Sequence, residues 1–162
     1  MPAPPRESDK PAAVPSPPRV LRPRDAATLV VVDSAGHEAR VLMGRRREDL
    51  VFMPGKYVFP GGRVDAADRQ IACADCLLPT EERKLLAGMK GTVNPDRARA
   101  LALAAVRETF EEAGLLIGEV RDAGEDKGTA AASRRTIPAS WQPFIDHGLL
   151  PRVGALTLFA RA

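Results

Sequence analysis

The sequence predicts a single α+β domain from three features of the chain. Residues 26–33 form a β-rich run, which a turn and a second β-rich run follow, as in a hairpin. Residues 58–65 have the pattern of a strand that ends in a turn at two adjacent glycines. Residues 95–113 form a long helical segment. With 162 residues, 44% of them hydrophobic and 28% charged, the chain can bury the core of one globular domain.

The first hairpin is expected over residues 26–44, with its turn at 34–37. Three consecutive arginines stand directly after its second strand: Arg45, Arg46 and Arg47. Taken alone, a basic run of this kind is also typical of a solvated loop.

The flanking residues indicate where the long helix begins and ends. Asn94 is a good N-cap, Pro95 suits the first helical position, and Gly114 suits the left-handed position past the end. One face of the helix is predicted to be buried, because apolar residues recur there at helical spacing: Leu103, Val106, Phe110 and Ala113.

Three carboxylates near the end of this helix are the most informative feature of the chain. Successive helical residues turn by about 100°, so Glu108, Glu111 and Glu112 fall on one side. Hard cations such as Mg²⁺ take oxygen ligands of this kind together with substrate phosphates. A solvated, glutamate-rich surface helix is the alternative interpretation. The upstream pair Gly61-Gly62 favours the cation site, because glycines let the backbone approach a ligand closely.

At these residues the chain resembles the Nudix hydrolases, whose signature is G-x5-E-x7-R-E-U-x-E-E-x-G-U with U a bulky apolar residue. Residues 107–115, Arg-Glu-Thr-Phe-Glu-Glu-Ala-Gly-Leu, match its second half, with Thr109 a mild departure. Residues 59–62, Phe-Pro-Gly-Gly, match the usual lead-in, and Asp68 stands where the family has its first glutamate. Between Asp68 and Arg107 lie 38 residues instead of seven, so an insertion of 31 residues splits the motif. The resemblance covers residues 26–115.

The resemblance implies an α/β/α sandwich, the Nudix fold, with a mixed central sheet. A Nudix domain normally continues with further strands and a C-terminal helix beyond a point such as Ala162, so we expect the chain to be truncated at its C-terminus. The split motif is similar to that of one branch, the peroxisomal coenzyme A diphosphatases and their bacterial relatives.

The resemblance also implies roles for the site residues. Glu111 and Glu112 would be the main metal ligands, with the carbonyl of Gly61, and Glu108 a further ligand or the base that orients water. Arg107 would hold the glutamates by charge-assisted hydrogen bonds, and Asp68 would do part of the first glutamate's structural work unless the insertion displaces it. The substrate would contact Gly62, Arg45 and Arg46. The cofactor would be Mg²⁺, with Mn²⁺ as a substitute.

The implied reaction is hydrolysis of the diphosphate bond of a nucleoside diphosphate-linked compound, with coenzyme A or an acyl-CoA as the first candidate. The alternatives are ADP-ribose, a dinucleotide or an oxidised nucleotide triphosphate as substrate, and a Nudix-like binding module without turnover. Tyr57 and Trp141 are the large rings with a polar edge, and the sequence does not show which of them, if either, stacks on a base. A homodimer is a further expectation, since dimers are common in the family.

Composition excludes some other classes of protein. A net charge of only +3 gives no case for general nucleic-acid binding. The chain has no apolar run long enough for a membrane span and no secretory signal, so we expect a cytoplasmic protein. Cys73 and Cys76 form a lone C-x-x-C, a weak zinc signal because a structural zinc needs two more ligands.

The remaining segments complete the predicted domain, residues 25–162. Residues 1–24 are rich in proline and are expected to form a disordered tail. The insertion, at about 69–93, contains a helical run near 80–86. After a soft stretch to about residue 135, we expect a short helix at 138–147 and a strand at 153–160.

Overall fold

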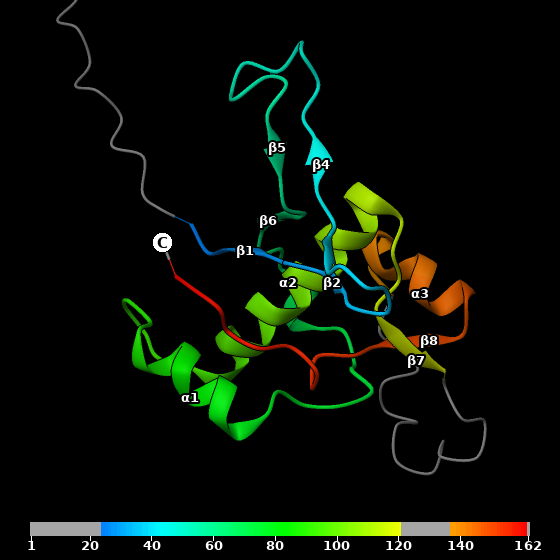
Figure 1. Cartoon of the computed structure of the whole chain (residues 1–162). Helices are drawn as coiled ribbons and strands as arrows, with labels where there is room; N and C mark the ends of the chain where they lie inside the picture. The colour runs from blue at the N-terminus through cyan, green and yellow to red at the C-terminus, as the bar shows by residue number, and fades with distance from the viewer. Residues whose placement is uncertain (1–23, 121–136, 162) are drawn as a thin grey trace, which may run out of the picture.

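The helix α2 (Pro95–Ala113) is the centre of the fold in the computed structural model, which describes residues 24–120 and 137–161 (Figure 1). Its predicted boundaries are confirmed. The Asn94 side chain accepts a hydrogen bond from the amide of Asp96 at 2.8 Å, and Gly114 ends the helix with φ 69°. Only glycine adopts that left-handed backbone without strain, which is why the helix stops there.

The burial of α2 differs from the one-sided pattern that the sequence predicts. Leu103 and Val106 are fully buried, but so are Ala100 and Ala104, whereas Ala113 is exposed. The reason is that α2 packs on several elements at once: β1 (Ala26–Thr28) and β6 (Gly61–Arg63), the 3₁₀ turn η1 (Ala67–Arg69) and α1 (Pro79–Ala87). Small alanines on the other faces let these elements approach closely.

Within the described residues the strands form four separate two-stranded sheets, all antiparallel. β1 pairs with β6. The other pairs are β2 (Val32–Asp33) with β3 (Arg40–Val41), β4 (Gly44–Arg45) with β5 (Tyr57–Val58), and β7 (Gly118–Val120) with β8 (Leu149–Pro151). The α+β class is confirmed. The single mixed sheet is not found in this part of the chain, because each strand of two or three residues has one partner and no parallel neighbour.

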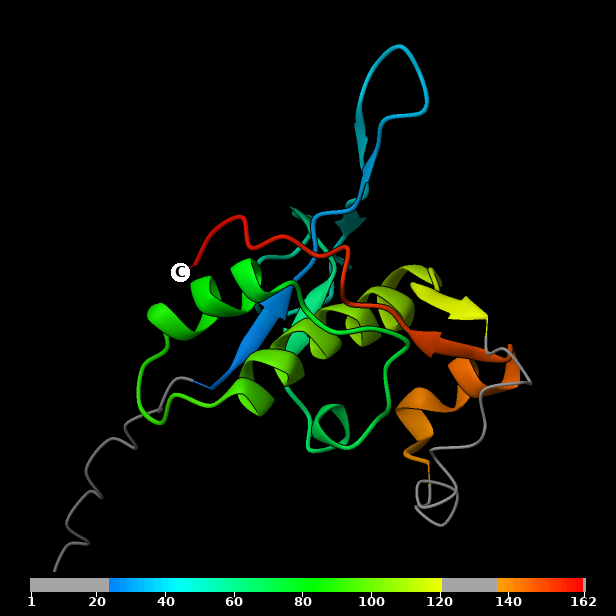
Figure 2. The ribbon, with the colours of Figure 1, turned by 90° about the horizontal axis from the view of Figure 1, so that it is seen from below.

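The C-terminal segment corrects one prediction. Residues 153–160 do not form a strand, and the strand is β8 instead, which lies earlier. The amides of Val153 and Gly154 donate to the Asp75 carboxylate, at 2.7 and 2.9 Å, and the amide of Leu158 donates to Glu81. Side chains of the insertion therefore take the backbone donors that a sheet would need. Figure 2 shows this segment passing beside α1 toward the C-terminus.

The predicted helix at 138–147 is confirmed as a 3₁₀ turn, η3 (Ala139–Trp141), that continues into α3 (Gln142–Asp146). Trp141 and Phe144 are fully buried, and Phe144 packs edge-on to Phe110 of α2 with ring centroids 6.0 Å apart. Trp141 therefore belongs to the core, and its ring is not accessible for stacking on a base.

Two predicted segments lie outside the described residues: the proline-rich tail up to residue 23 and the soft stretch at 121–135. Across the described ranges, none of the helices combines the length and the apolar character that crossing a membrane requires.

Candidate active site

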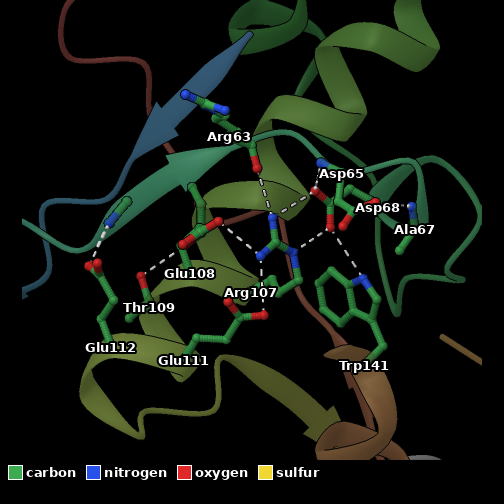
Figure 3. A network of polar contacts seen from close by, with 12 residues as sticks. Arg63, Asp65, Ala67, Asp68, Arg107, Glu108, Thr109, Glu111, Glu112 and Trp141 are labelled. Atoms are coloured by element: carbon green, nitrogen blue, oxygen red, sulfur yellow. Dashed lines mark hydrogen bonds and ion pairs between the residues drawn. The ribbon is translucent and has the colours of Figure 1, made fainter. Parts of the chain in front are cut away.

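A buried ion pair joins the start of the insertion to the end of α2 (Figure 3). Asp68, in η1, has no exposed surface, and Arg107 is 4% exposed. The Oδ1 atom of Asp68 accepts from Arg107 Nε at 2.8 Å, and Oδ2 accepts from Nη2 at 3.1 Å. Such a two-point contact fixes the plane of the guanidinium as well as its position.

Two further donors complete the surroundings of Asp68. The indole Nε1 of Trp141 donates to Oδ1 at 3.2 Å, and the amide of Asp65 donates to Oδ2 at 2.8 Å. Buried carboxylates are stable only when paired and hydrogen-bonded in this way. The insertion therefore leaves Asp68 in contact with Arg107, although 39 positions separate the two residues.

Arg107 uses its remaining hydrogens on the other side. Its Nη1 donates to Glu108 Oε1 at 2.9 Å and to Glu111 Oε1 at 3.1 Å, and its Nη2 also donates to the carbonyl of Arg63 at 2.9 Å. Burial alone would lower the pKa of Arg107, but hydrogen bonds and charge from Asp68, with the two glutamates, outweigh it and raise that pKa. Arg107 therefore stays charged and holds two glutamates from one nitrogen.

Glu108 lies against the glycine turn. A Cβ atom at Gly62 would collide with the Glu108 carboxylate, so only glycine leaves the space that this side chain occupies. The Glu108 side chain is 15% exposed. Burial raises the pKa of Glu108, and the charge of Arg107 opposes that rise.

Glu112 contacts the same turn at Gly61, one residue before Gly62. The amide of Gly61 donates to Glu112 Oε2 at 3.0 Å. A Cβ at Gly61 would lie 2.6 Å from the backbone of Ala27 and of Thr28, so glycine here permits the close pairing of β1 with β6. The structure thus brings together Gly61, Gly62 and all three helix glutamates with Arg107.

The donor set fits a hard divalent cation in kind. Glu108 and Glu111 each place an oxygen within 3.1 Å of the same nitrogen, and Glu112 lies at the adjacent glycine. Mg²⁺ takes oxygen ligands and is usually held by one or two carboxylates together with water and substrate phosphates. In the part of the chain that the structure describes, no three acidic, cysteine or histidine side chains converge into a closed metal site.

Two predicted substrate contacts lie elsewhere. Arg45 and Arg46 are at the base of the β4–β5 hairpin, which projects from the body of the fold (Figure 1). The Arg45 side chain pairs with Glu48 at 2.6 Å, and the Arg46 Nε donates to the carbonyl of Phe52 at 3.1 Å. Both guanidinium groups are therefore engaged within the hairpin.

Sequence reasoning missed two parts of the network, the indole of Trp141 and the carbonyl of Arg63. No motif marks either of them. A lone tryptophan near a predicted helix signals a core position, and a carbonyl carries no residue-type signal at all.

An open depression of about 460 Å³ adjoins the network. It is lined by Arg107 and Glu108 on one side and by residues of the β1–β6 ladder and the turn after it on the other: Arg24, Arg63, Val64, Asp65 and Ala66. A volume of this size is typical of small-molecule sites, which span about 300–1,000 Å³.

The fold is similar to that of a Nudix hydrolase from Alicyclobacillus acidocaldarius, known from a crystal structure. The TM-score is 0.54 and the sequence identity is 27%, and the match covers 85% of this chain and 60% of that one. No protein-family model matches the chain. The chain therefore has the α+β Nudix fold, and it spans 60% of the length of that hydrolase.

Proposed function

We propose that this chain, which has the fold of a Nudix hydrolase, is a metal-dependent hydrolase that cleaves the diphosphate bond of a nucleoside diphosphate-linked compound. One observation carries the proposal. Arg107, fixed on its far side by the buried Asp68, holds Glu108 and Glu111 beside the glycine turn that Glu112 also contacts.

The chain's own residues would position the reactants. Glu111 and Glu112 would hold Mg²⁺, or Mn²⁺ in its place, with the backbone of Gly61 adjoining them. When bound, such an ion neutralises phosphate charge and lowers the pKa of coordinated water. Glu108 lines the depression and is the candidate to bind or orient the attacking water. Arg107 holds Glu108 and Glu111 in place and offsets the repulsion between their charges, which is how positioning contributes to phosphoryl transfer.

Coenzyme A or an acyl-CoA is the first candidate substrate, on the resemblance of the split motif to coenzyme A diphosphatases. ADP-ribose, a dinucleotide and an oxidised nucleotide triphosphate present the same diphosphate to the same glutamates, so they remain candidates in any screen.

The test is a mass-spectrometric product screen on the purified chain with Mg²⁺, using coenzyme A, ADP-ribose, NADH and 8-oxo-dGTP. We expect 4′-phosphopantetheine from coenzyme A, and its loss in Glu112→Gln. An exposed acid of the hairpin supplies a matched control, since Asp49→Gln leaves the glutamates untouched. If no compound is hydrolysed, the result favours the alternative of a Nudix-like binding module without turnover. Titration with Mn²⁺ by electron paramagnetic resonance then asks whether the glutamates hold a metal at all.

A further inference from the structure

Two arginines lie beside the candidate site without joining its ion-pair network. Arg24 precedes β1 and Arg63 ends β6, and both residues are exposed. Within residues 24–120 and 137–161, neither guanidinium forms an ion pair. Only the backbone carbonyl of Arg63 takes part in the network, through Arg107.

The strand register places the two side chains on one face of the ladder. Ala26 pairs with Arg63, and the amide of Val64 donates to the carbonyl of Asp25 at 2.9 Å, so the pairing continues toward Arg24. Residues two apart on a strand point to the same face. Gly62 faces Glu108 of α2, so the neighbouring Arg63 side chain points to the opposite face, as Figure 3 also shows.

The depression connects that face to the glutamates. Its lining includes Arg24 and Arg63 as well as Glu108 and Arg107. Asp65 is the other acid in its lining, and its Oδ1 accepts from the amide of Ala67 at 3.3 Å. A ligand in the depression therefore lies beside Glu108 and within the same lining as Arg24 and Arg63.

We propose that Arg24 and Arg63 bind a phosphate group of the substrate other than the diphosphate that is cleaved. The scissile diphosphate would lie at the glutamates, which hold the cation that neutralises it. A separate phosphate monoester carries its own charge, and guanidinium groups bind phosphate with matching geometry. The site would thus select nucleotide-linked diphosphates that carry an additional phosphate. This inference rests on the proposed function for its kinetic test but has an independent binding test.

The kinetic test compares coenzyme A with 3′-dephospho-coenzyme A, which differ only in one phosphate monoester. We expect a higher kcat/KM for coenzyme A, and a KM for coenzyme A that rises about fivefold to tenfold in Arg24→Gln and in Arg63→Gln. In each variant, the KM for 3′-dephospho-coenzyme A and the kcat values for the two substrates should stay within about twofold of those of the unaltered chain. Arg63→Lys keeps the charge and should restore part of the preference. Arg83→Gln, an exposed arginine on α1, is the matched control. Equal losses on both substrates would place the arginines at the scissile diphosphate and overturn the inference.

The binding test needs no turnover. Isothermal titration of the full chain should show tighter binding of adenosine 3′,5′-bisphosphate than of AMP. A variant that carries both Arg24→Gln and Arg63→Gln should bind the two ligands equally well. If no substrate is hydrolysed but this difference is present, the proposed reaction fails and the phosphate site stands. If the two ligands bind equally well to the unaltered chain, the phosphate site fails whatever the kinetics give.

Discussion

At the scale of single residues, one buried ion pair fixes the arginine that holds two glutamates of α2, Glu108 and Glu111. Arg107 contacts Asp68 through two nitrogens and two glutamates through the third, so any change at Asp68 is transmitted to Glu108 and Glu111. The aspartate side chain is short, but it reaches Arg107 because the turn η1 packs closely on α2.

Asp68→Asn should therefore lower both stability and turnover. The substitution leaves Arg107 buried without a full countercharge, and breaking a buried pair on one side costs about 3–5 kcal/mol. Urea denaturation measures the free energy of unfolding, with Asp49→Asn on the exposed hairpin as control.

Arg107→Ala should likewise lower both the free energy of unfolding and the rate of turnover. A melting curve that is unchanged in Arg107→Ala would contradict the positioning role of this residue.

Glu112→Gln should remove at least about 99% of turnover while the fold is kept, since even partners that only orient metal ligands cost 10–100-fold. The side chain is exposed, and its neutral amide can still accept from the Gly61 amide. Glu111→Gln should behave alike. Steady-state rates and circular dichroism on the same samples separate a loss of turnover from a loss of the fold. Near-normal rates in either variant would contradict the assignment of that glutamate as a metal ligand.

At the scale of elements, the two glycines of the turn have different tasks. Gly61 lies against the backbone of β1, which cannot move aside, whereas Gly62 lies against a side chain. Gly61→Ala should therefore force β1 from β6 and destabilise the chain by about 1–3 kcal/mol. Gly62→Ala should keep the fold, because Glu108 can turn away, but should lose activity. Thermal melts and product assays on the two variants give the comparison. Equal loss of stability in both would show that Glu108 is as immobile as the strand.

The sequence predicted α2 well because its ends depend on local residues. Asn94 and Gly114 act on backbone groups within a few positions. The strand expected at 153–160 failed for the opposite reason: its amides bond to Asp75 and Glu81, which are 77 to 79 positions away in the chain. The acidic helix and the glycine turn were predicted as one site, and the geometry brings them together, but the partner Trp141 was not foreseeable from any local pattern.

At the scale of the whole molecule, the insertion joins parts of the chain that are distant in sequence. The turn η1, which leads into the insertion, supplies Asp68 to α2, and the insertion's own residues hold the segment after β8. Asp75 accepts from the amides of Val153 and Gly154, and Arg161 donates to carbonyls near the end of α1. The insertion is therefore part of the domain's packing and not an appendage, and Ile71 and Leu77 belong to the common core.

This connection should loosen in acid at a definite place. Glu81 accepts from Lys84 Nζ at 2.7 Å and from the amide of Leu158 at 2.8 Å, and these hydrogen bonds lower its pKa. A carboxyl whose pKa is lowered by folding stabilises the folded state above its unfolded pKa, about 4.3 for glutamate, and that contribution is lost as the pH falls through the lower folded value. From pH 7 to 3, the amide resonance of Leu158 should therefore shift with a midpoint below about 4.3. In Glu81→Ala, the amide resonance of Leu158 should already have at pH 7 the position that it takes in the unaltered chain at low pH. The amide resonance of Gly114 should be unchanged. A Leu158 amide that does not respond to pH or to this substitution would mean that apolar packing alone holds the segment against α1.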